Sequence, residues 1–152
     1  MPEATCLTLE PIAAEAVLSW ALQGETEAGA AAMFLGIVRA DRDPRREVDA
    51  LWYEAYDAMA LAQLERLLAR AKVRWPLQKV HVRHRVGRVP VGEIALAVVV
   101  TAPHRKEAFA ALRFLVDRIK LELPIWKRTH YTDGTQGWAD APAHVEETHA
   151  LV

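Results

Sequence analysis

The sequence predicts a single α+β domain with helices on one side of a largely antiparallel sheet. The chain has 152 residues, which suits one domain and is long enough to bury a substantial core. Apolar residues make up 52% of it and charged residues 26%, as in a folded globular protein. Strand-like and helix-like segments are mixed along the chain without an internal repeat, an order typical of α+β folds. We therefore treat residues 1–152 as one domain.

The first quarter of the chain predicts two strands and a short helix. Residues 6–10 are expected to form a strand, and residues 11–22 a helix with Pro11 near its first turn. The apolar run at 31–40 is rich enough in branched side chains for a buried strand. Gly36 within this run suggests a bulge or the close approach of another backbone.

The middle of the chain predicts a loop, a strand and a long helix. Residues 41–47 are polar and are expected to form a loop, whereas residues 48–56 are strand-like. Asp57 is suited to cap the helix that follows, and Pro76 marks the end of that helix. The apolar stripe expected to face the core from this helix consists of Met59, Leu64, Leu67, Leu68 and Ala71.

The second half of the chain predicts three more strands and the longest helix. Residues 79–87 alternate in polarity, which predicts a strand with two distinct faces, and residues 92–102 predict a buried strand. The helix is expected at 104–123, before Pro124, and a final strand at 125–131 is followed by a turn at Asp133-Gly134. The alternating strand carries Val80, Val82, His84 and Val86 on one face and His81, Arg83 and Arg85 on the other.

Charge and cysteine content exclude several classes of function. The net charge of −1 argues against binding nucleic acid or a membrane surface through bulk charge. The longest apolar runs fall far short of the ~20 residues that a membrane helix needs. Cys6 is the only cysteine, which excludes an intramolecular disulfide, a cysteine-based zinc site and a two-cysteine redox pair. The first ten residues have no secretory signal pattern, so we expect a cytoplasmic protein.

Basic side chains gather at the ends of the predicted elements, beside apolar segments. The start of a helix favours an anion, because its free backbone N–H groups and the helix dipole point toward the ligand. His104 and Arg105 add donors suited to phosphate oxygens at such a start. The candidates for anion binding are Arg39, His104, Arg105, Lys120, Lys127 and Arg128.

Each of these candidates also has a purely structural explanation. Lys120 lies at the border of an apolar stripe, where a lysine commonly buries its stem and keeps its head in water, with Asp117 as a candidate ion partner. Lys127 lies on a strand whose outer face would be solvated. His81 and His84 point to opposite faces of a strand and make a poor metal pair, so no metal site is predicted. The single residues therefore indicate only an anion-binding α+β domain.

Six segments of the chain form a pattern when they are taken in order. They are FLGIVR (34–39), YEAYDAMA (53–60), HRVGRVPVGE (84–93), HRKEAFAALRFLVDRIK (104–120), PIWKR (124–128) and DGTQGW (133–138). Together these segments resemble the large catalytic subunit of molybdopterin synthase. The resemblance covers about residues 28–138, which would form the core of the domain and leave a C-terminal tail at 139–152.

The resemblance implies a fold, an activity and partners. The fold would be an α/β hammerhead-like domain with additional antiparallel strands, assembled as a central homodimer. A small ubiquitin-like sulfur-carrier subunit would bind at each end to complete a heterotetramer. The C-terminal Gly-Gly tail of the carrier, charged as a thiocarboxylate, would deliver sulfur to cyclic pyranopterin monophosphate and build the dithiolene of molybdopterin for the molybdenum cofactor. The chain is then expected to be a sulfurtransferase with no cofactor of its own, because the sulfur arrives on the carrier.

The resemblance also implies roles for the basic residues. Lys120 and Lys127 fall on catalytic positions, with Lys120 nearest the thiocarboxylate carbon. A charge pair at ~4 Å is worth roughly 4 kcal/mol at an effective dielectric constant of 20, against about 1 kcal/mol in water, so sheltered lysines suit this task. His104 and Arg105 are expected to reach the site across the dimer. The substrate-binding positions fall on Arg39, His104, Arg105 and Arg128.

Some features depart from the family pattern, and other interpretations stay open. Thr129 stands where an acid is usual, Pro44 stands in a loop that more often contains glycine, and the tail at 139–152 has no arginine. One alternative is a binding module that keeps the groove for the carrier tail without turnover. Another is a phosphate-binding enzyme unrelated to pterins, which would bind phosphate compounds without any partner.

Overall fold

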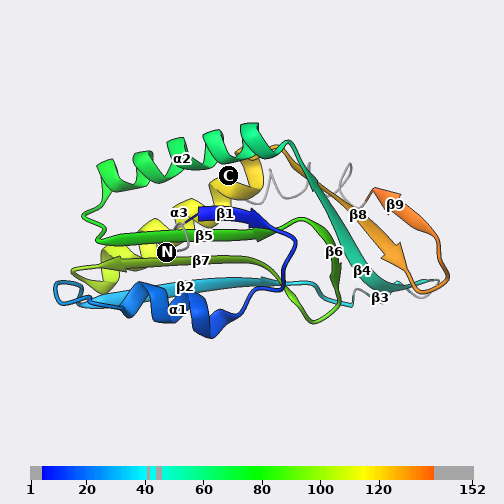
Figure 1. The fold of residues 1–152 in the computed structure, drawn as a ribbon, viewed down its shortest axis with the longest axis horizontal. Coiled ribbons are helices and arrows are strands. Elements are labelled where there is room, and N and C mark those ends of the chain that lie inside the picture. The colour runs from blue at the N-terminus through cyan, green and yellow to red at the C-terminus, as the bar shows by residue number, and fades with distance from the viewer. Residues whose placement is uncertain (1–4, 41, 44–45, 139–152) are drawn as a thin grey trace.

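The computed structural model describes residues 5–40, 42–43 and 46–138, and in them it forms an α+β fold built on two sheets (Figure 1). The first sheet has the order β1–β5–β7–β2. Its strands are β1 (Thr5–Thr8), β2 (Ala30–Ile37), β5 (Lys79–Arg85) and β7 (Ile94–Ala102). All its pairs are antiparallel except β1 with β5. The predicted fold class and the largely antiparallel sheet are therefore confirmed.

Helices cover both faces of this four-stranded sheet. The two long helices, α2 (Asp57–Arg74) and α3 (Arg105–Glu122), pack on one face, where they meet Val98 and Val100 of β7. The short helix α1 (Ala14–Leu22) packs on the other face, against Ala97 and Val99. Side chains of a strand alternate between faces, and β7 is apolar on both, so each face needs a cover. The prediction of helices on one side holds for the long pair and is wrong for α1.

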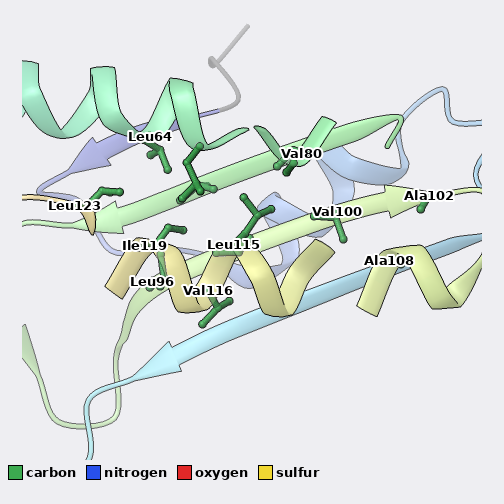
Figure 2. Packing of buried hydrophobic residues seen from close by; sticks show 14 residues of the cluster. Leu64, Val80, Leu96, Val100, Ala102, Ala108, Leu115, Val116, Ile119 and Leu123 are labelled. Atoms are coloured by element: carbon green, nitrogen blue, oxygen red, sulfur yellow. The ribbon is translucent and has the colours of Figure 1, made fainter. Parts of the chain in front are cut away.

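The main core lies between the sheet and the two long helices (Figure 2). In this view Ala108 of α3 lies toward Ala102 of β7, whereas Val116 and Ile119 lie toward Leu96. The helix therefore runs back along the sheet from the end of β7 to its beginning. Gly36 of β2 pairs with Leu96, so α3 ends where β2 also ends.

The second sheet stands at one end of the first and draws its strands from three separate parts of the chain (Figure 1). Its central strand is β4, which pairs with β6 on one side and β8 on the other, while β3 and β9 extend the edges. The five strands are β3 (Arg42–Asp43), β4 (Arg46–Ala55), β6 (Gly87–Pro90), β8 (Ile125–Tyr131) and β9 (Gln136–Trp138).

Two predictions about this sheet were wrong. The polar stretch 41–47 is not simply a loop, because Arg42–Asp43 pairs with the start of β4. The strand at 125–131 is not the last one, because β9 pairs with it after the turn at Asp133-Gly134. That turn itself is confirmed, with Gly134 at φ +86°, a left-handed conformation that glycine adopts without strain.

Local details of β2 and α2 confirm one prediction and correct two others. The register of β2 shifts between Gly36 and Ile37, which confirms the predicted bulge. Asp57 does not cap α2 but is its first residue, after Tyr56 at the N-cap. Met59, expected in the core stripe, is exposed, and Ala60 is buried instead. In the described residues, no helix is long and apolar enough to span a membrane.

Candidate functional site

Lys127 occupies the middle of β8 and faces Tyr53 on the neighbouring strand. Tyr53 is its direct partner in the antiparallel pairing of β4 with β8, and directly opposed residues share one face of a sheet. On the other side of β4, Tyr53 pairs with Gly87, where the chain has just left β5 for β6. Gly87 has φ +81°, which permits this sharp change of direction. The corner brings the end of β5 beside Tyr53.

His84 is the residue that this corner delivers to Tyr53. The two rings meet edge to face, with centroids 5.1 Å apart and planes at 72°. The side chain of His84 is buried, with 7% of its surface exposed, and its Nδ1 lies 2.7 Å from the carbonyl oxygen of Arg85. A carbonyl oxygen only accepts hydrogen bonds, so Nδ1 carries the proton and donates.

The charge state of His84 follows from its surroundings. Burial lowers its pKa to about 4, the bond to the Arg85 carbonyl opposes this shift, and the ammonium groups of Lys127 and Lys120 add to it. The imidazole is therefore neutral near pH 7. Two lysines that are seven positions apart in the sequence thus act on one buried ring.

Lys120 reaches this region from the last turn of α3. Ile119 beside it is buried in the core, so Lys120 sits at the border of the apolar stripe, as predicted. It is exposed in the described chain, which corrects the expectation that the chain alone shelters it. Asp117, the candidate ion partner, instead accepts a hydrogen bond from Nε of Arg113 at 2.9 Å. The predicted ion partner of Lys120 therefore pairs with another residue.

Arg39 follows β2 at the same end of the molecule. The residue before it, Val38, packs with Val89 and Ala95, and Tyr53 packs against the same small cluster. The N–H of Val38 also donates to the carbonyl oxygen of Glu93 at 3.0 Å, which ties the segment to the start of β7. Arg39 is exposed at this junction of the two sheets. The structure therefore brings it into the region of Lys120 and Lys127.

His104 and Arg105 lie at the opposite end of α3. His104 is the N-cap residue with extended backbone and no capping bond from its side chain, and both residues are exposed. Fifteen residues separate Arg105 from Lys120, which at 1.5 Å per residue is about 22 Å along the helix. Within one chain, these two predicted substrate-binding residues are not brought together with the lysines.

Arg128 points to the other face of β8, because side chains alternate along a strand. One of its terminal nitrogens lies 2.8 Å from a carboxylate oxygen of Glu54, and the other donates to Gln136 at 3.2 Å. Its guanidinium also lies 5.9 Å from the ring of Trp52. The next residue, Thr129, is buried, and the carboxylate that pairs with Arg128 comes from Glu54 of β4. Arg128 is thus separated from Lys127 by the sheet.

A groove opens on the sheet near the Arg128 face. It has a volume of about 390 Å³ and is lined by Glu54, Ala55, Tyr56 and Trp126. The rings of Tyr56 and Trp126 meet at right angles with centroids 5.1 Å apart. Trp126 is 42% exposed although its hydrophobic segment looks suited to burial.

Sequence reasoning missed two residues of the Lys127 region. His84 was considered as half of a poor metal pair, whereas the structure makes it a hydrogen-bonded core histidine beside the lysines. Tyr53 was not singled out at all. A tyrosine within a strand gives no local signal, because its partner depends on the register of β4 with β8. In the described ranges no group of three or more metal-ligating side chains occurs. Pro44 and the tail at 139–152, where departures from the family pattern were noted, lie outside those ranges.

Comparisons with known proteins give a consistent result. The sequence model of the MoaE protein family matches residues 7–122. The molybdopterin synthase catalytic subunit of Pyrococcus abyssi is 42% identical over 125 residues, which cover 82% of this chain and 83% of that protein. The corresponding protein of a Nostoc species is 37% identical over 138 residues, 90% of this chain and 82% of its own length.

Solved structures show the same fold. The crystal structure of molybdopterin synthase from Staphylococcus aureus matches with a TM-score of 0.83 and 30% identity, covering 91% of this chain and 98% of that chain. A complex of subunits 1 and 2 of the molybdopterin-converting factor from Helicobacter pylori matches with a TM-score of 0.78. Its identity is 20%, with 92% of each chain covered, so this likeness concerns the fold alone.

Proposed function

The chain belongs to the MoaE protein family and is an enzyme of molybdopterin synthesis that transfers sulfur, and on that premise we propose how its residues do so. Lys120 and Lys127 hold the thiocarboxylate tail of a small ubiquitin-like carrier subunit, which ends in Gly-Gly. Cyclic pyranopterin monophosphate binds beside this tail, with Arg39 as a phosphate contact, and accepts the sulfur. No metal or cofactor takes part, because the partner brings the sulfur.

One observation carries this proposal: Lys127 lies directly opposite Tyr53, Tyr53 meets the buried ring of His84 edge to face, and the last turn of α3 with Lys120 ends at the same corner of the first sheet. Because His84 is neutral, it adds no third positive charge that would repel the two ammonium groups. A thiocarboxylate and a cyclic phosphate are both anions, and fixed cations stabilise charge that develops on an acyl group without reorganisation at the moment of reaction. Docking of a carrier over the exposed Lys120 would exclude water and strengthen these interactions.

A reconstituted reaction tests the proposal. The wild-type protein is mixed with thiocarboxylated carrier and cyclic pyranopterin monophosphate, and dithiolene formation is followed. Lys120→Ala is expected to form little product. Lys72→Ala is the matched control, because Lys72 is likewise an exposed lysine in the last turn of a long helix, and it should act like wild type. Dithiolene formation by Lys120→Ala at the wild-type rate would show that the role given to Lys120 is wrong.

We also propose that the site is completed by a second copy of the chain. His104 and Arg105 lie about 22 Å along α3 from Lys120, too far to serve the same ligand from one chain. In a homodimer with twofold symmetry, the amino end of one α3 can approach the carboxyl end of the other, and each site then receives one set of residues from each copy. One carrier at each end makes this assembly a heterotetramer.

Mixing of two impaired variants tests the shared site, with cyclic pyranopterin monophosphate kept below its KM so that the loss at the amino end is visible. Lys120→Ala is combined with the double variant His104→Ala/Arg105→Ala under conditions in which subunits exchange. A mixed dimer has one site with all wild-type residues, so about a quarter of all sites become intact after random exchange, and activity returns. If each site were built from a single chain, no site would be intact and mixing would restore nothing. Sedimentation of each variant controls for the dimeric state.

A further inference from the structure

One buried side chain beside the two lysines has no part in the proposed transfer. His84 lies near the end of β5, at the corner where the chain leaves the first sheet for β6. Its ring meets Tyr53 edge to face, and Tyr53 lies directly opposite Lys127. A continuous path of contacts therefore runs from β5 through β4 to the lysine on β8.

The main chain fixes the orientation of this imidazole. Nδ1 donates to the carbonyl oxygen of Arg85 at 2.7 Å, so rotation of the ring would break a buried hydrogen bond. Arg85 is itself anchored, because one terminal nitrogen lies 2.6 Å from Glu93 and the other donates to the carbonyl oxygen of Arg88 at 3.0 Å. The support under Tyr53 is consequently rigid.

The charged side chains that act on His84 are those of two lysines. Lys127 comes from β8 and Lys120 from α3, and both act on the ring through their charges. The side chain of Arg85 points to the other face of β5, where Glu93 pairs with it. The neutral ring therefore supports the two lysines without adding a third positive charge.

We propose that His84 is a positioning residue for sulfur transfer, which holds Tyr53 against Lys127 and so fixes the lysine in the site. The inference rests on the proposed function of Lys127. A histidine suits this position because the flat ring gives Tyr53 an edge-to-face contact while its Nδ1–H satisfies the Arg85 carbonyl. An aliphatic residue would give neither contact.

The same strand offers a matched control. His81 is also buried, with 2% of its surface exposed, and burial lowers its pKa to about 4 as well. It points to the opposite face of the sheet and packs against Trp20 of α1, with ring centroids 4.7 Å apart. Replacement of His81 therefore removes an equally buried imidazole without touching Tyr53 or the lysines.

The test compares His84→Asn with His81→Asn by turnover, thermal unfolding and acetylation of individual lysines read by mass spectrometry. His84→Asn keeps a donor for the Arg85 carbonyl but loses the ring, so kcat should fall roughly ten- to hundredfold at little changed KM. Lys127 should be acetylated faster than in wild type, while Lys106 is unaffected. His81→Asn should lower the melting temperature but leave kcat and Lys127 labelling unchanged.

A second pair of variants covers the case in which His84→Asn does not fold. His84→Phe keeps the ring contact with Tyr53 and should retain more activity than His84→Leu. Wild-type kcat and Lys127 labelling in His84→Asn, or equal kcat losses in His84→Asn and His81→Asn, would overturn the proposal, as would equal activity of the Phe and Leu variants. The labelling readout needs no turnover, so failure of the proposed function, seen as full activity of Lys127→Ala, is distinguishable from failure of the positioning role.

Discussion

The two ends of α3 both carry basic side chains, but they differ in what lies around them. At the amino end, His104 and Arg105 are exposed and follow directly from the last residues of β7. At the carboxyl end, Lys120 and, from the second sheet, Lys127 both act on the buried neutral ring of His84, which lies near the end of β5 in the first sheet. Basic residues at helix ends therefore do not by themselves locate a site. We place the site where β8 adds a second cation, Lys127, and the neutral ring of His84 supports it.

A rigid helix separates the two ends. Its 18 residues span about 27 Å, so ligands bound at one end do not touch the other within one chain. In the proposed assembly, the carboxyl end belongs to the transfer site of its own chain, whereas the amino end serves the site of a second copy. The following predictions test this division, beginning with the largest expected effect.

Replacement of the residue that holds α3 on the sheet should disturb both ends together. Leu115 is fully buried between α3 and the first sheet, and Leu115→Ala is expected to lower the free energy of unfolding by about 2–5 kcal/mol. Urea unfolding measures this loss. Leu121→Ala, on the exposed side of the same helix, is the control and should change stability by no more than about 0.5 kcal/mol. Equal losses in the two variants would contradict the packing described.

Replacement of Lys127 should impair only the part of the site that lies at the carboxyl end of α3. Lys127→Ala is expected to lower kcat roughly 10²–10³-fold, the usual cost of losing one group that stabilises developing charge. Arg128→Ala is the informative comparison, because Arg128 lies on the other face of β8 and is paired with Glu54. Steady-state turnover should show a smaller loss for Arg128→Ala. A larger loss there would move the site to the opposite face of the sheet.

Acid should destabilise the fold around His84, beside the carboxyl end of α3. The folded-state pKa of His84 is about 4, below its ordinary value of 6.5, so between these values the unfolded chain binds a proton that the folded chain does not. Stability is therefore full above pH 6.5 and falls as the pH drops toward 4, by up to about 3 kcal/mol for this group. Urea unfolding of His84→Phe between pH 7 and 4.5 should show a flatter dependence than wild type. The same dependence of unfolding free energy on pH in both proteins would mean that His84 is not buried in its neutral form.

The amino end should show the smallest effect. Arg105→Ala removes an exposed charge at a helix start, worth about 0.3–1 kcal/mol, so KM for cyclic pyranopterin monophosphate should rise roughly two- to fivefold with kcat retained. Lys106→Ala, which removes the neighbouring exposed charge, should leave KM unchanged. A loss of kcat in Arg105→Ala as large as in Lys127→Ala would erase the difference between the two ends.

Much of the fold follows from local patterns in the sequence. The continuous apolar run of β7 predicts a strand buried on both faces, and the bulge after Gly36 follows from a glycine within an apolar strand. Features that depend on pairing between separate segments of the chain do not follow from local patterns. β9 exists because Gln136–Trp138 pairs back onto β8, and no short-range pattern announces that pairing. The position of α1 likewise depends on which face of the sheet the long helices leave open.

The same limit applies to the site. Lys120 and Lys127 were predicted from the resemblance of their segments, and the structure brings them to one region. Tyr53 and His84 could not be placed beside them, because that requires the register of β4 with β8 and the corner at Gly87. His104 and Arg105 matched the same family segments, yet a single chain places them at the far end of α3. Resemblance thus proposed the site residues, while three-dimensional pairing decides which of them meet.

A zero-length carbodiimide cross-link tests most directly where the carrier tail binds. The reagent joins a carboxylate to an amine that touches it, so the carrier with its ordinary C-terminal carboxylate is cross-linked to the wild-type protein and the joined peptides are sequenced. We predict an amide between the terminal glycine of the carrier and Lys120 or Lys127. A terminal glycine found only on Lys106 or Lys72, with both site lysines unmodified, would contradict the account.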